Sequence, residues 1–163
     1  MAAEFSSSAV QLVAANGSVI FTETPVPCNK GLVYHRDESG IFRLASPSTM
    51  GCGCNVIRTC CCQQMPTSNY EVAFHANIAI PTDPAGTVEA ISLAIAIDGE
   101  IDPSSIMTIT PAAVGEYGNV GADIIVSVPS ICRCSSVSVR NISTQAINVQ
   151  NANLVVDYVG IRR

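Results

Sequence analysis

Cysteine is the residue type in this sequence with the clearest capacity for chemistry. Five of the eight cysteines fall in residues 50–68, a segment with little hydrophobic periodicity that we expect to form a Cys-rich loop. The complete set is Cys28, Cys52, Cys54, Cys60, Cys61, Cys62, Cys132 and Cys134. Residues two apart share a face of an extended segment, and three pairs have that spacing: Cys52 and Cys54, Cys60 and Cys62, and Cys132 and Cys134.

The cysteine pattern leaves three interpretations open, namely disulfides, a metal site and free thiols. The even number favours disulfides, within or between subunits. A bridge that closes the loop between the 50s and the 130s would stabilise the fold by about 3–5 kcal/mol. Structural zinc sites typically use C-x₂₋₄-C twice, which C-x-C and CCC do not match. We therefore treat all eight cysteines as disulfide candidates and predict no metal ligand.

The remaining polar residues do not form a recognisable catalytic pattern. His35 and His75 stand alone in the sequence, and each is expected to be a hydrogen-bonded structural histidine. The acidic loops around Asp37 and Asp98 lack the D-x-D-x-D-G calcium pattern, so we expect solvated turns. The glycines of residues 115–121 have no lysine beside them, which disfavours a phosphate loop. The sequence therefore predicts no catalytic residue, no cofactor and no enzymatic activity.

Composition excludes some classes of partner. The 163 residues are 48% hydrophobic and only 13% charged, against about 25% charged in ordinary soluble domains. No apolar run reaches the roughly 18 residues of a membrane-spanning helix, so we expect subunit contacts to cover the apolar surface. The net charge of −5 disfavours a nucleic-acid interface, which needs clustered lysine and arginine.

Two apolar runs between residues 70 and 100 organise the predicted fold. Side chains of a strand alternate between two faces, and the large apolar residues of each run mostly fall at every second position. The first run has Tyr70, Val72, Phe74, Ile78 and Ile80, and the second has Val88, Ile91, Leu93, Ile95 and Ile97. Turn residues 81–86 separate the runs. We expect two adjacent core strands of an antiparallel all-β domain.

Further strands are predicted on both sides of this core. The expected strands are 18–23, 31–36 and 40–45 as a hairpin, 105–110, 123–128, 137–141, 146–150 and 154–159. About eight to ten short strands separated by proline and glycine are typical of a sandwich, jelly roll or barrel. We expect one domain over residues 1–163, with residues 1–15 as a docking arm swapped to a neighbour.

The order of these motifs resembles a known family. GSVIF, GIFRLAS, YEVAFHANIAI, ISLAIAIDGE, DIIVSVP, SVSVRNIS and NLVVDYV follow one another as in the bacterial and phage relatives of the C1q/TNF-like jelly roll. The sequence is also similar to small uncharacterised proteins of gut Firmicutes and their phages. The resemblance implies an antiparallel jelly-roll sandwich that packs as a homotrimer around a threefold axis through apolar faces.

The expected function combines this resemblance with the cysteine content. The N-terminal residues do not resemble a Sec signal peptide, yet disulfides are rare in cytosolic proteins. A virion protein released by lysis satisfies both observations, and so does a mature chain whose signal peptide was removed or a set of cysteines that binds metal. We expect a non-enzymatic homotrimer that decorates a phage virion, contacts other virion proteins such as the major capsid protein, and reaches the host surface. The alternative is a binding or structural domain of the bacterial cell surface or spore coat.

Overall fold

The fold is an antiparallel jelly-roll sandwich, as the sequence predicts. The computed structural model describes residues 2–28, 31–36, 38–46, 67–129 and 134–162. Twelve strands and one short 3₁₀ helix form within them. Their bounds are β1 Ala2–Ser7, β2 Gln11–Val13, β3 Glu23–Val26, β4 Val33–His35, β5 Phe42–Ala45, β6 Thr67–Ala79, β7 Ile91–Ile97, β8 Glu100–Ile101, η2 Pro103–Ser105, β9 Met107–Ile109, β10 Gly118–Pro129, β11 Cys134–Asn141 and β12 Ile147–Arg162.

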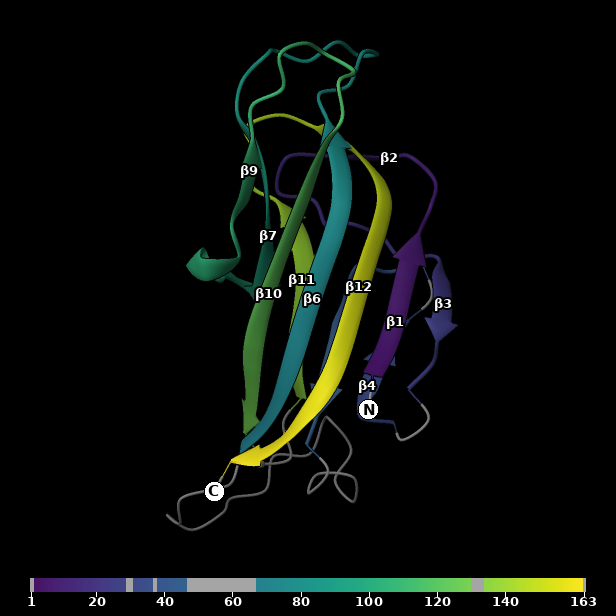
Figure 1. Cartoon of the computed structure of the whole chain (residues 1–163), viewed down its shortest axis with the longest axis vertical. Helices are drawn as coiled ribbons and strands as arrows, with labels where there is room; N and C mark the ends of the chain where they lie inside the picture. The colour runs from purple at the N-terminus through teal and green to yellow at the C-terminus, as the bar shows by residue number, and fades with distance from the viewer. Residues whose placement is uncertain (1, 29–30, 37, 47–66, 130–133, 163) are drawn as a thin grey trace.

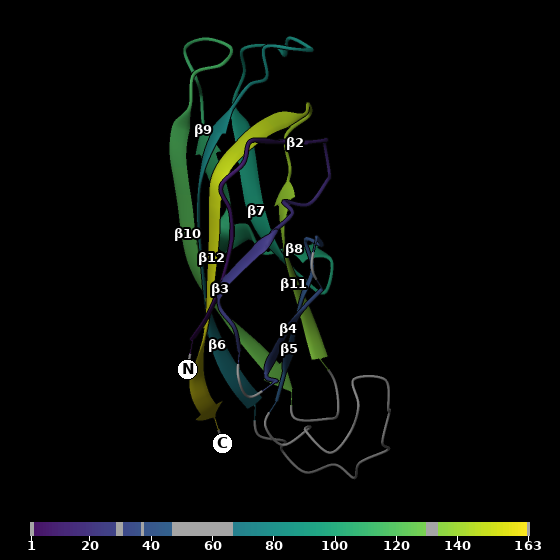
Figure 2. The same cartoon turned by 90° about the vertical axis from the view of Figure 1, so that its right-hand side faces the viewer.

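Two six-stranded sheets form the layers of the sandwich (Figures 1 and 2). Sheet A has the order β10-β6-β12-β1-β3, with β2 also paired to β12. Sheet B has the order β4-β5-β11-β7-β8, with β9 also paired to β7. The chain changes sheet after β3, β5, β6, β9, β10 and β11, so it crosses repeatedly between the two layers. This alternation between two antiparallel sheets is the jelly-roll arrangement.

Apolar residues at every second position create the core between the sheets. Strand β6 has its buried positions at even numbers from Ser68 to Ile78, and β12 repeats this pattern beside it. Aromatic rings then connect the layers, because Phe42 of sheet B lies 4.7 Å from Phe5 of sheet A and 5.1 Å from Phe21, measured between ring centroids. Such tilted pairs contribute about 0.5–1.5 kcal/mol each beyond their buried area.

One prediction about the core strands is wrong. The two apolar runs do form strands, β6 and β7, but β6 belongs to sheet A and β7 to sheet B, so they are not adjacent in one sheet. The reason is the connection between them. Residues 81–90 make a tight turn between Thr82 and Ala85 but do not return the chain alongside β6. They carry it across the sandwich, where β7 turns its apolar side chains to the same core from the opposite layer.

Strand lengths also differ from the prediction of short strands. Strands β6, β10 and β12 have 13, 12 and 16 residues. Strand β12 joins the two predicted strands 146–150 and 154–159, and β10 begins at Gly118, five residues before the predicted strand 123–128. The predicted strand 18–23 is replaced by β3, which begins at Glu23. Backbone amides of Val19, Phe21 and Thr22 bond three separate segments, at Val139, Ser39 and Ser6, so no ladder forms there.

The structure bears only in part on two predicted segments, the Cys-rich loop and the N-terminal docking arm. Most of the Cys-rich loop, residues 50–66, lies outside the described residues, while Thr67 and Ser68 begin β6. Within residues 1–15, β1 and β2 both pair with β12 of the same chain. That this segment also reaches a neighbouring subunit stays a prediction. No helix among the described residues is long and apolar enough to span a membrane.

Candidate functional site

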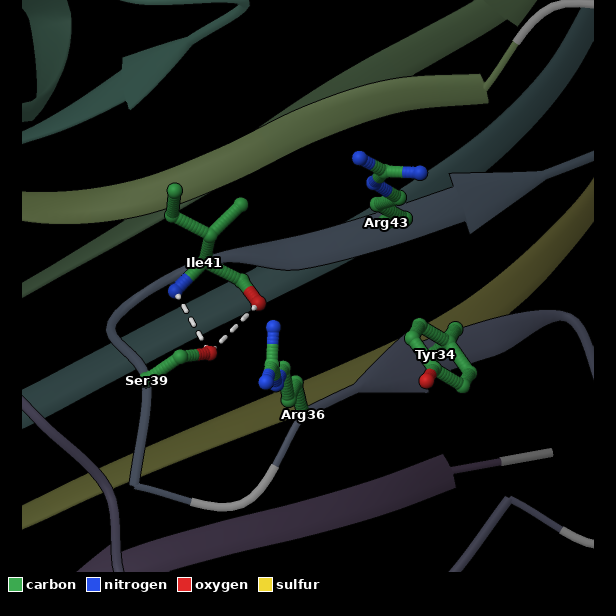
Figure 3. A pocket seen from close by; sticks show the side chains of 5 residues that line it. All are labelled: Tyr34, Arg36, Ser39, Ile41 and Arg43. Atoms are coloured by element: carbon green, nitrogen blue, oxygen red, sulfur yellow. Dashed lines mark hydrogen bonds between the residues drawn. The ribbon is translucent and has the colours of Figure 1, made fainter. Parts of the chain in front are cut away.

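A shallow pocket on the outer face of sheet B is the candidate functional site. It has a volume of about 410 Å³ and is lined by Tyr34, Arg36, Ser39, Ile41 and Arg43. We call it the Tyr34–Arg43 pocket. The β4–β5 hairpin supplies all five residues (Figure 3). Tyr34 lies directly opposite Arg43 in the antiparallel register, and strand alternation brings the polar and aromatic side chains to one face.

The inward side of the same hairpin fixes the pocket to the core. His35 and Phe42 are paired across the hairpin, and their rings stack at 4.5 Å with an interplanar angle of 16°. His35 Nε2 also lies 2.9 Å from the carbonyl oxygen of Ser39, which closes the turn. Its other ring nitrogen, Nδ1, is buried and has no hydrogen-bond partner among the described residues. The predicted structural role of His35 therefore agrees with its packing, although only one ring nitrogen is satisfied.

The two arginines of the pocket have unused hydrogen-bonding capacity. In the part of the chain that the structure describes, no carboxylate pairs with Arg36 or Arg43. Arg140 on β11 differs, because its guanidinium donates to the carbonyl oxygens of Asn16 at 2.9 Å and Gly99 at 3.4 Å. The pocket thus presents two free guanidinium groups, a phenol and a hydroxyl, which suit the binding of an anion. It contains no general base or nucleophile with an activating partner.

The structure separates the cysteines that it describes. Cys28 is a free, partly buried thiol packed against the core. Cys134 lies at the start of β11 and is disulfide-bonded. The other candidates lie outside the described residues: Cys52, Cys54, Cys60, Cys61, Cys62 and Cys132. The prediction that Cys28 takes part in a disulfide is therefore wrong, and the pairing of the other candidates stays a prediction.

Of the other polar residues named from the sequence, Asp37 lies outside the described residues, and a hydrogen-bonded role for His75 stays a prediction. His75 is exposed on β6, on the face opposite Phe74 as expected, and its ring lies over Gly121, where a Cβ would come within 2.4 Å of Nδ1. The Asp98 carboxylate accepts from the backbone amide of Ser136 at 2.6 Å, and Asp102 caps η2. No group of three or more His, Cys, Asp or Glu side chains suited to a metal ion occurs among the residues described.

Sequence reasoning predicted the hairpin of the pocket but missed the pocket itself. The available signal was the repeated pattern of Tyr34-x-Arg36 and Ile41-x-Arg43, which places four large side chains on one face once the hairpin forms. Two smaller hollows, of about 260 and 240 Å³, lie in the loops around Pro111 and Pro84. Neither brings charged groups of one sign together.

Comparison with known proteins gives loose structural similarity alone. No family model and no curated protein matches the sequence. A family 35 carbohydrate-binding module from Clostridium thermocellum superposes on 93% of this chain and 90% of its own, with 14% identity and a TM-score of 0.35. An N-terminal fragment of xylanase 10B from the same organism, with CBM22-1 and GH10 modules, superposes on 98% of this chain but 27% of its own, with 10% identity and a TM-score of 0.32. At these TM-scores neither superposition assigns a function.

Proposed function

We propose that the protein is a non-enzymatic structural domain that assembles as a homotrimer on the surface of a phage particle. The motif resemblance to C1q/TNF-like jelly rolls supports the trimer, and the cysteine content supports a virion product. Partners are two further copies of the chain and other virion proteins such as the major capsid protein. A binding or structural domain of the bacterial cell surface or spore coat is the second candidate, because the same fold and surface suit it.

The observation that carries the proposal is exposed apolar surface at one end of sheet A. Ile125, Val159 and Ile161 are 58%, 59% and 49% exposed. The strand register places them towards the same end of sheet A, since Ile125 lies opposite Glu71, Tyr158 opposite Tyr70 and Ile161 opposite Ser68. Glu71 is exposed and Ser68 is buried, so Ile125 and Ile161 point to opposite faces at this end. Exposed apolar groups at one end of a sheet, in a chain with 13% charged residues, are typical of a subunit contact.

Native mass tests the proposed assembly. Light scattering after size exclusion should give about 51 kDa, three times the 17.0 kDa of one chain, with and without reductant. Ile125→Lys should dissociate the trimer, because three lysine ammonium groups would lose water near the contact. Val88→Lys is the matched control, since Val88 is 50% exposed and lies in the 81–90 connection, away from this end of the sheet. A 17 kDa wild-type species would contradict the proposal.

Immunogold microscopy distinguishes the two candidate locations. Antibody against the folded domain should label phage particles from a producing strain under the first candidate. Labelling of spores or of the cell wall, with unlabelled particles, would favour the second candidate instead.

A further inference from the structure

We propose that the Tyr34–Arg43 pocket is a binding site for a carboxylate-bearing sugar. The proposal goes beyond the structural role above, because it assigns a ligand to a surface that the trimer contact on sheet A does not use. Pockets that bind small ligands have volumes of about 300–1,000 Å³ and a few convergent polar groups. The 410 Å³ pocket falls within that range.

The charge of the pocket is the first argument for an acidic ligand. The chain has a net charge of −5, yet two of its eight basic residues, Arg36 and Arg43, line this one hollow. A guanidinium group that stabilised the fold would be expected to resemble Arg140, which donates to two backbone carbonyl oxygens. Arg36 and Arg43 have no such partner in the described structure, so their donors are available to an anion. Arginine forks match the planar geometry of a carboxylate.

The apolar part of the pocket is the second argument, and it favours a ring over a bare anion. Tyr34 is 62% exposed and Ile41 is 52% exposed, so both offer apolar surface within the pocket. Figure 3 shows the Tyr34 ring and Ile41 on either side of Arg36, with Arg43 above on β5. A sugar acid offers both an apolar ring face for Tyr34 and a carboxylate for the guanidinium groups.

The form of the hairpin argues against an acidic peptide as the ligand. Peptides that add to a sheet edge need a run of unpaired backbone groups, and β4, the edge strand beside the pocket, has only three residues. A sugar does not require this edge. The His35–Phe42 stack and the 2.9 Å contact between His35 Nε2 and the carbonyl oxygen of Ser39 hold the hairpin before a ligand arrives.

Calorimetry with the intact chain tests the proposal with paired probes. Oligogalacturonate and a sialic acid oligomer are the carboxylate probes, and the methyl-esterified form of each is the neutral control. We expect at least one acidic probe to bind and its ester to bind at least tenfold more weakly. Arg43→Gln should weaken binding about tenfold or more, as expected for a hydrogen bond between charged groups. Arg43→Lys should restore it only in part, because lysine lacks the fork.

Variants of tyrosine separate the ring contact from charge alone. Tyr34→Ala should weaken binding of the acidic sugar, whereas Tyr117→Ala, at a tyrosine that is 40% exposed in another loop, should not. Unchanged far-UV circular dichroism and native mass would show that each variant is folded. The native mass also separates this proposal from the trimer, since a wild-type monomer that binds the probe would contradict only the trimer.

Three results would overturn the sugar site. They are failure of both acidic probes to bind, equal binding of the methyl esters, and equal or tighter binding of polyglutamate or inorganic sulfate. Polyglutamate binding that depends on Arg43 would instead indicate an acidic peptide as the ligand.

Discussion

Replacement of Asn141 by alanine should destabilise the sandwich by about 3 kcal/mol. Asn141 is fully buried at the end of β11. Its Nδ2 donates to the carbonyl oxygens of Val13 at 3.0 Å, Ala14 at 3.2 Å and Gln145 at 2.8 Å. Its Oδ1 accepts from the backbone amide of Ser143 at 2.9 Å. One side chain thereby joins the end of β2, the end of β11 and the turn into β12.

The magnitude follows from the number of bonds that the amide can make. An Asn amide has two N–H donors, so three acceptors share two hydrogens, and the 3.2 Å contact is the weakest. Three well-formed bonds at about 1 kcal/mol each give about 3 kcal/mol. Domains of this size lose about 2–4 °C in Tm for each kcal/mol, so Tm should fall by about 6–12 °C.

Urea unfolding followed by far-UV circular dichroism measures the effect, because the chain has no tryptophan. Asn119→Ala is the matched control, since its exposed amide makes only two contacts, at 3.2 and 3.4 Å, with Asn77 and Ala76 of β6. We expect that control to change the unfolding free energy by less than about 0.5 kcal/mol. A loss below about 1 kcal/mol for Asn141→Ala would show that water replaces the amide and would refute the reasoning.

Asn141→Asp gives an independent check of these hydrogen bonds, because aspartate has nearly the same shape as asparagine. A carboxylate cannot donate to the carbonyl oxygens of Val13 and Gln145, so burial and these acceptors should raise the pKa of the new aspartate in the folded state. A group whose pKa is raised in the folded state contributes its full stability below its unfolded-state pKa, about 3.9 for aspartate. This contribution is lost as the pH rises through the folded-state pKa. The deficit relative to wild type should therefore be larger at pH 8 than at pH 4.

Two further predictions concern Tyr70 and Gly40. Burial raises the pKa of Tyr70 above its usual 10.0, with Tyr158 and Cys28 adding to the shift, so stability that is present below pH 10 should fall as pH rises further. Tyr70→Phe should reduce this loss of stability at alkaline pH, although it also removes the hydrogen bond to the Ala45 carbonyl oxygen. If the pH profile of urea unfolding is the same in the variant and the wild type, the prediction is wrong. Gly40→Ala should cost about 2 kcal/mol, because a Cβ there would lie 2.5 Å from the backbone oxygen of Val19; a thermal melt within 1 °C of wild type would contradict this.

Much of the fold could be predicted because strand patterns are local. Alternation in YEVAFHANIAI sets which side chains of β6 are buried, and that pattern is present in the sequence without reference to any partner. The β4–β5 hairpin was likewise predictable, since its two runs flank a short turn with Gly40. The strand proposed at 18–23 failed because its apolar residues are buried by separate segments, which no local pattern reveals.

The candidate site could not be predicted in the same way. Tyr34 and Arg43 are nine residues apart, and only the hairpin register makes them direct neighbours. Asn141 gave still less warning, because asparagine is mostly exposed in folded proteins, whereas this amide is buried and hydrogen-bonded. Burial of a polar group depends on which segments converge around it, and those segments lie up to 128 residues away.

The sequence by itself determined the all-β class, the antiparallel sandwich and most strand positions, because side-chain alternation and turn residues act within a few residues. Tertiary structure decided which sheet each strand joins. Strands β6 and β7 have equally strong patterns and are neighbours in sequence, yet they lie in opposite layers. The physical reason is that either layer would bury their apolar faces, and only the path of residues 81–90 and the competing partners β12 and β11 select between them.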